Sequence, residues 1–192
     1  MRYTGTMGLR KQLLNYTLTA LLAGVGFSTP LYADEARVDQ LFEQLRAAPP
    51  EEVDRLQNRI LDEWRRSGSP AMDLLLRRGE DALEEGDAAR AVEHFSALVD
   101  HAPTFAEGYN GRAAAFYQLE LYGPAIDDLR QVLVLEPRHF GALTGVAVVL
   151  EELDRFDDAL EVWQQIASYA PADPEVLAVI ERLENRLQGQ SL

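Results

Sequence analysis

Apolar residues recur at the spacing of an amphipathic helix in three segments of the chain, and each segment ends on a proline. The segments lie 34 residues apart and cover Ala89–Pro103, Gly123–Pro137 and Asp157–Pro171. Each helix should stop at its proline, because proline cannot continue a helix and disfavours helical geometry in the residue before it. A fixed period of this length is typical of stacked supersecondary units.

A second helix precedes each of these segments and aligns at the same interval. Small residues recur in both helices, where they would let the two backbones approach closely, and large apolar residues recur around them. The small positions are Gly79, Ala113 and Ala147 in the first helices and Ala91, Ala125 and Ala159 in the second. The pattern therefore predicts three helical hairpins of one design.

This pattern resembles the tetratricopeptide repeat (TPR), a 34-residue helix–turn–helix unit with small residues at positions 8 and 20 and proline at position 32. The resemblance covers residues 72–105, 106–139 and 140–173. It implies an all-α fold, in which three repeats form a right-handed superhelix (α-α superhelix). Arg78 and Arg112 replace the usual leucine at position 7, and we expect Asp128 on the paired helix to be the ion partner of Arg112.

Helices are also predicted on both sides of the repeats. Residues 174–192 are expected to form a capping helix and tail, with Asp173 as N-cap and Pro174 in the first turn. Residues 34–70 predict two amphipathic helices hinged at Pro49-Pro50 and a short joint. We interpret this N-terminal pair as packing on the first repeat, and a detachable partner-binding hairpin is the alternative.

The first 33 residues predict a secretory signal peptide. They contain three basic side chains and no acidic one, then the apolar run Leu13–Phe27, and we expect cleavage after Ala33. Translation can start at Met1 or at Met7. An uncleaved membrane anchor is the alternative, although the run is shorter than the roughly 20 apolar residues that a membrane-spanning helix needs. The expected location is the periplasm or the exterior.

The charge of the remaining chain restricts its partners. Beyond Ala33 there are 15 arginines, no lysine and 32 acidic residues, hence a net charge of −17. Such a field repels phosphate backbones and anionic lipid, so we expect no nucleic-acid partner and no stable membrane insertion after signal cleavage. The chain has no cysteine, which excludes disulfides and thiolate metal sites.

No catalytic motif is found beyond residue 33, where GxSxG, P-loop and GxGxxG patterns are missing. His94 and His101 are two helical turns apart, about 10 Å along the axis, too far to share one ion without unusual reach. His139 follows Pro137 in a loop, and we interpret all three histidines as exposed. Adjacent acids such as Asp157-Asp158 are interpreted as solvated helix faces. The sequence predicts no cofactor, no metal site and no enzymatic activity.

The surface that a TPR array creates is the remaining candidate. In the family, positions 5, 9, 12 and 13 of each first helix face a concave groove. Here these are Leu76, Glu80, Leu83, Glu84, Asn110, Ala114, Tyr117, Gln118, Thr144, Val148, Glu151 and Glu152. The carboxylate clamp, which grips acidic chaperone tails with Lys, Arg and Asn at positions 5 and 9, is not supported by these residues.

The predicted function is a non-catalytic protein–protein interaction module, an exported scaffold or adaptor. Its groove is apolar in the middle and acidic at the rims, so the expected partner is a protein or peptide with apolar anchors and basic residues. Two alternatives remain open at this point. One is a structural subunit of a homo- or hetero-oligomeric envelope assembly, and the other is an enzyme accessory protein.

Overall fold

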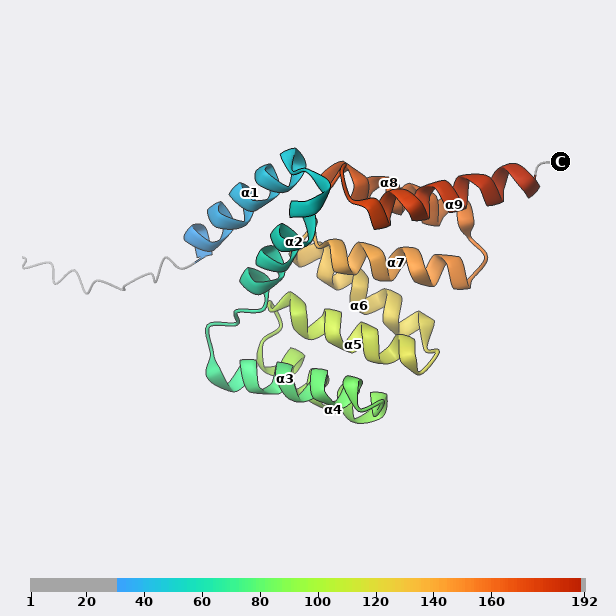
Figure 1. Cartoon of the computed structure of the whole chain (residues 1–192). Coiled ribbons are helices and arrows are strands. Elements are labelled where there is room, and N and C mark those ends of the chain that lie inside the picture. The colour runs from blue at the N-terminus through green and yellow to red at the C-terminus, as the bar shows by residue number, and fades with distance from the viewer. Residues whose placement is uncertain (1–30, 191–192) are drawn as a thin grey trace, which may run out of the picture.

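The computed structural model describes residues 31–190, and within that range the chain forms nine α-helices and no strand (Figure 1). The prediction of an all-α fold is confirmed. Of the signal peptide predicted for residues 1–33, residues 1–30 lie outside the described residues. The helices are α1 Leu31–Ala47, α2 Pro50–Trp64, α3 Pro70–Glu84, α4 Ala88–His101, α5 Ala106–Gln118, α6 Tyr122–Leu135, α7 Phe140–Glu152, α8 Phe156–Tyr169 and α9 Pro174–Gln190.

The helices α3 to α8 form three antiparallel hairpins stacked side by side, with α3, α5 and α7 in one layer (Figure 1). The small residues lie where the helices of a hairpin touch. A Cβ added to Gly79 would lie 2.5 Å from the ring of Phe95. Ala91, Ala125 and Ala159 are each 0% exposed. The predicted close helix contact is therefore confirmed, and it leaves no room for a larger side chain.

Ala125→Leu tests this contact. The added atoms have no space beside α5, so the free energy of unfolding is expected to fall by about 1–3 kcal/mol. Urea unfolding followed by circular dichroism measures the change. Ala89→Leu is the control, because Ala89 is exposed on α4 and should accept leucine with little cost. Equal effects of the two substitutions would contradict the packing described here.

The turn inside each hairpin requires one residue in the left-handed backbone region. This residue is Gly86, Glu120 or Asp154, with φ of 77°, 59° and 56°. The three positions are 34 residues apart, but only the first repeat has glycine there. A residue with a Cβ is disfavoured in this region by roughly 1–2 kcal/mol, so the second and third turns carry a local strain that the first one avoids.

Gly86→Ala should therefore lower the free energy of unfolding by about 1 kcal/mol. The matched control is Gly123→Ala, since Gly123 lies in helix α6, lacks a left-handed φ and has nothing within 4 Å of an added Cβ. That control should be neutral or slightly stabilising. Thermal unfolding of both variants measures the difference. A Gly86→Ala protein as stable as the wild type would refute the strain argument.

The predicted ion pair between Arg112 and Asp128 is confirmed. The guanidinium of Arg112 donates from Nε and from a terminal nitrogen to the two carboxylate oxygens, each at 2.7 Å. Only 20% of the Arg112 side chain and 9% of the Asp128 side chain are exposed. The hydrogen bond to Asp128 raises the pKa of Arg112. The pair links α5 to α6 and is structural.

The apolar faces of the N-terminal pair pack on the third repeat and not on the first, so that prediction is wrong. Its apolar stripes, which include Phe42 and Ile60, form one buried cluster with Ala170, and Phe140 and Tyr169 pack against it. These partners belong to the third repeat and the α8–α9 loop. The stripes pack against a large apolar surface, and the end of α8 provides it. An amphipathic pattern predicts that a helix face is buried, but it does not identify the element that covers this face.

Helix α2 crosses the edge of the array where the first helices of the repeats begin (Figure 1). Gln57 donates to Asp173 at 2.8 Å, just before α9. Seven residues later, Trp64 stacks on His139, the N-cap of α7, with ring centroids 4.4 Å apart. Arg65 then pairs with Glu80 of α3 at 2.6 Å. The pair therefore connects one end of the array to the other.

Helix α9 closes the far end of the array. Asp173 is its N-cap, as predicted, and accepts from the backbone N–H groups of Glu175 at 3.0 Å and Val176 at 3.2 Å. Leu183 is fully buried against the third repeat. The other side of the helix is exposed and mostly polar, although Leu177 lies on it. Across residues 31–190, every helix is too short or too polar to cross a lipid bilayer.

Candidate peptide-binding groove

A pocket of about 320 Å³ lies between α5 and α7, and we call it the groove pocket. Five of the predicted groove residues line it together. Its lining consists of Asn110, Ala113, Ala114, Tyr117, Gln118, Leu129, Gly141, Gly145, Val148 and Val149. This lining is mostly apolar and contains no carboxylate, histidine, lysine or arginine, so the pocket suits an apolar side chain and offers no acid–base pair for catalysis.

Two glycines of α7 shape the groove pocket. A Cβ added to Gly145 would lie 3.0 Å from a methyl carbon of Leu129, so α7 approaches α6 closely there. A Cβ on Gly141 would lie 3.2 Å from the ring of His139. Because neither glycine projects a side chain, the wall formed by α7 is hollow between Val148 and the start of the helix.

The rim of the groove pocket is polar and negative on one side. The hydroxyl of Tyr117 donates to Oε1 of Glu152 at 3.3 Å and thereby connects α5 to α7. The Tyr117 and Tyr122 rings lie 5.8 Å apart. Burial raises the pKa of Tyr117, and the negative charge of Glu152 raises it further. Tyr117 is therefore a neutral donor at the rim, held beside an exposed carboxylate.

Asn110 connects the groove pocket to a buried hydrogen-bond chain. Its Nδ2 donates to Oε2 of Glu107 at 3.1 Å, and Oε1 of Glu107 lies 3.0 Å from Nε2 of His139. Nδ1 of His139 accepts from the backbone N–H of Ala142 at 3.0 Å, so the proton of the neutral ring lies on Nε2, directed at Glu107. The chain fixes the orientation of Asn110 in the pocket.

His139 is completely buried, so its prediction as an exposed surface residue is wrong. Two tertiary contacts bury it, the stack on Trp64 and the bond to Glu107. Neither contact could be predicted from the local sequence around position 139, because Trp64 and Glu107 lie far away in the chain. Of the other two histidines, His101 is exposed and His94 is half-buried.

The predicted groove residues of the first repeat do not join the pocket. Leu76 is only 4% exposed and packs in the core with Phe95. Leu83 is half-buried and packs against the same cluster. Glu80 pairs with Arg65 of α2, and its pKa is raised by burial, which the charge of Arg65 partly offsets. Glu84 is exposed.

The third repeat contributes only in part. Thr144 lines a separate hollow of about 210 Å³ with Gln57 and Trp163. Glu151 is occupied by its neighbours, since it accepts from Nε1 of Trp163 at 3.0 Å and pairs with Arg182 of α9 at 2.7 Å. Val148 lines the groove pocket, and Glu152 lies at its rim. The accessible groove is therefore centred on α5 and α7.

Five lining residues were missed by the sequence pattern, namely Ala113, Leu129, Gly141, Gly145 and Val149. Ala113 was predicted as a helix-contact residue, and the structure places it at the pocket floor as well. The signal that could have found the hollow wall is the spacing of Gly141 and Gly145, one helical turn apart on a single helix. Glycines at that spacing remove side chains from one face.

Stacked helical hairpins with a groove between their first helices define the class of this protein, an α-helical repeat protein of the superhelix type. No family model matches the chain. A TPR repeat-containing protein of Rhizobium etli is 33% identical over 154 residues, which span 80% of this chain and 76% of the relative. The chain belongs to the TPR family.

More distant similarities lead to the same fold. The small glutamine-rich TPR-containing protein 2 of Mycosarcoma maydis is 28% identical over 99 residues, which span 52% of this chain and 28% of that protein. The TPR2B domain of yeast Sti1, solved as a pHsp70 complex, matches 62% of this chain and 99% of its own, with a TM-score of 0.57 and 20% identity.

Two further structures complete the comparison. The first TPR domain of Spaghetti (RPAP3), bound to the HSP90 peptide SRMEEVD, matches 61% of this chain and 93% of its own, with a TM-score of 0.57 and 16% identity. A mutant of MamA matches 82% of this chain and 89% of its own, with a TM-score of 0.51 and 18% identity. These structures show the fold, and none of the comparisons indicates an enzymatic family.

Proposed function

We propose that this protein is a non-catalytic scaffold or adaptor that binds a peptide segment of a partner protein in the groove pocket. The observation that carries the proposal is the pocket itself, about 320 Å³ of mostly apolar surface between α5 and α7 with oriented polar groups at its edge. An apolar anchor residue would fill it and Asn110, fixed by Glu107, could bind the peptide backbone.

The partner segment should carry basic residues beside its anchor. Glu152 is exposed on α7 at the rim, beside Tyr117, and no arginine lines the groove pocket. The solved relative that binds SRMEEVD holds a peptide with three acidic residues. A peptide of that charge would be repelled here, whereas Arg or Lys would be attracted to the negative rim.

A matched pair of peptides tests this proposal. Each has one central leucine, with arginines on both sides in one peptide and glutamates in the other, and fluorescence anisotropy with the full chain measures both affinities. We expect the arginine peptide to bind at least about tenfold more tightly at low salt, and the difference to shrink at about 0.5 M salt through screening. Equal binding, or tighter binding of the glutamate peptide, would exclude the proposed specificity.

We also propose that the protein is exported through its first 33 residues. Three basic side chains, the apolar run Leu13–Phe27 and the small residue Ala33 support a cleaved signal peptide. Fractionation of cells that produce the full chain with a C-terminal tag tests this. Leu21→Arg with Leu22→Arg should abolish processing and export, because charge disrupts the apolar run. A wild-type chain that stays in the cytosol at full length would refute the export proposal.

A further inference from the structure

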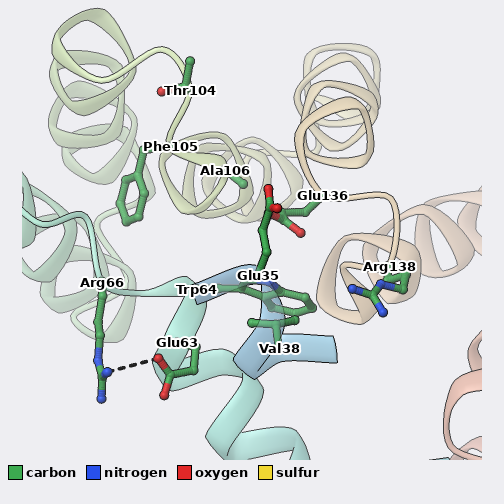
Figure 2. Close-up of a pocket in the computed structure, with 10 residues that line it drawn as sticks. All are labelled: Glu35, Val38, Glu63, Trp64, Arg66, Thr104, Phe105, Ala106, Glu136 and Arg138. Carbon is green, nitrogen blue, oxygen red and sulfur yellow. Dashed lines mark hydrogen bonds and ion pairs between the residues drawn. The ribbon is translucent and has the colours of Figure 1, made fainter. Parts of the chain in front are cut away.

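A second pocket, of about 190 Å³, lies where the N-terminal pair meets the repeats, and we call it the junction pocket (Figure 2). The start of α1, the end of α2, the α4–α5 loop and the α6–α7 loop each contribute to it. Its lining is Glu35, Val38, Glu63, Trp64, Arg66, Thr104, Phe105, Ala106, Glu136 and Arg138. None of these residues belongs to the groove pocket.

A buried donor in this lining has no partner. Trp64 is only 9% exposed, and the stack on His139 fixes its ring. Within the described part of the chain, the indole N–H of Trp64 makes no hydrogen bond. It lies near enough to Glu136 to favour the charged carboxylate, but not in bonding geometry. A buried donor left unpaired costs about 1–3 kcal/mol, so an acceptor bound in the pocket would be stabilised.

The start of α5 lies in the same wall and has no side-chain cap. His139 and Asp173 precede α7 and α9, and each accepts a backbone N–H bond at its helix start. The equivalent residue before α5 is Phe105, which provides no side-chain cap. Ala106, the first residue of α5, lines the junction pocket. The uncapped N–H groups and the positive end of the helix favour an acceptor oxygen there.

Two carboxylates provide the opposite charge. Figure 2 shows the side chains of Glu35 and Glu136 reaching toward one another above Trp64. Burial raises the pKa of Glu136, and the charge of Glu35 raises it further, while the charge of Arg138 and the indole N–H of Trp64 lower it. Burial is the largest of these causes, so the charge of Glu136 is poorly solvated.

The arginines of the lining are already engaged. Arg66 pairs with Glu63 at 3.0 Å. Arg138 pairs with Asp39 at 2.5 Å and lies over the Phe42 ring. Among the described residues, Glu35 and Glu136 have no ion pair with an arginine. Nor do three or more metal-ligating side chains gather anywhere in that range. A ligand ammonium would therefore meet two carboxylates that neither Arg66 nor Arg138 neutralises by a direct ion pair.

We propose that the junction pocket binds the head group of an α-amino acid, either free or as the first residue of a peptide. The ammonium would lie between Glu35 and Glu136. The neighbouring carboxylate or carbonyl oxygen would lie near the start of α5 and accept from the indole N–H of Trp64. This head group carries a donor and an acceptor on adjacent carbons, as the lining requires. The small apolar surface of Val38 and Phe105 would face a short side chain.

Isothermal titration of the full chain with three probes tests the proposal. The probes are L-alanine, the peptide Ala-Ala-Ala and its N-acetylated form. We expect the free ammonium to be required, so acetylation should weaken tripeptide binding at least about tenfold. Binding of L-alanine identifies a free amino acid as a sufficient ligand, and binding of the tripeptide alone identifies a peptide N-terminus. The proposal fails if neither L-alanine nor Ala-Ala-Ala gives heat of binding at concentrations up to about 10 mM, far above the dissociation constant of an ordinary ligand.

Two variants assign the binding to this pocket. Glu136→Gln should weaken the probe at least about tenfold, because it removes the charge that holds the ammonium. Trp64→Phe keeps a ring on His139 but removes the N–H, and about fivefold weaker binding is expected. Glu43→Gln, an exposed change on α1, is the control, and circular dichroism verifies that each variant is folded. Wild-type affinity in both test variants would overturn the proposal.

The junction pocket is independent of the proposed groove function. Ala114→Arg, which lies in the groove pocket, should leave amino-acid binding unchanged. If Ala114→Arg weakens alanine binding as strongly as Glu136→Gln does, the probe binds in the groove, and the junction assignment is wrong.

Discussion

His139→Ala is expected to lower the free energy of unfolding by about 3 kcal/mol, the largest effect of any single change proposed here. Three contacts end together. The indole of Trp64 loses the ring stacked at 4.4 Å, the N–H of Ala142 loses its cap, and Glu107, with 8% of its side chain exposed, loses its partner at Nε2. Urea unfolding followed by circular dichroism measures the loss.

A second variant separates the unpaired carboxylate from the lost packing. Glu107→Gln in the His139→Ala background removes the buried charge, and the double variant should recover about 1 kcal/mol of the loss. His101→Ala is the control, because His101 is exposed at the end of α4 and should change stability by less than about 0.5 kcal/mol. If His139→Ala is no more harmful than His101→Ala, the buried chain contributes nothing.

Ala114→Arg is expected to weaken peptide binding strongly without unfolding the protein. Ala114 is exposed on α5 and lines the groove pocket. A long cationic side chain there would cover the apolar surface and repel the basic residues of the proposed ligand, so affinity for the arginine–leucine peptide should fall at least about tenfold. Arginine is a good helix former, so the melting temperature should stay close to that of the wild type.

The matched control is Ala178→Arg, an exposed position on α9 outside the groove pocket. It adds the same charge and helix former but leaves the pocket open, so any loss of affinity it causes reports the general effect of one more positive charge. A groove variant that binds the peptide as well as this control would remove the groove pocket as the binding site.

The sequence predicted much of the fold because the information is local and repeated. The helical pattern, the small residues at Gly79 and Ala125 and the terminal prolines recur every 34 residues, so each hairpin supports the interpretation of the others. The ion pair of Arg112 with Asp128 was also predictable, since the two residues face each other within one hairpin. The candidate site was predicted around α5, where Asn110, Ala114, Tyr117 and Gln118 line the pocket, and at Val148 on α7.

The remaining site residues depend on contacts between elements far apart in the chain. Leu76 has the family spacing of a groove residue, but the packing around Phe95 places it in the core. Glu151 has the same spacing, but Arg182 and Trp163 occupy it. A position within a repeat specifies the face of a helix, and it does not specify which neighbour covers that face.

The sequence by itself determined that this protein is a stack of three helical hairpins with a capped end, because hydrophobic periodicity and small residues act within and between adjacent helices. Only the tertiary structure decided where the N-terminal pair docks, why His139 is buried and where the two pockets open. The docking and the burial arise where Phe42 and Trp64 of the N-terminal pair meet the third repeat, and the groove pocket opens where α5 meets α7. Burial against a distant element depends on the shape of the whole array.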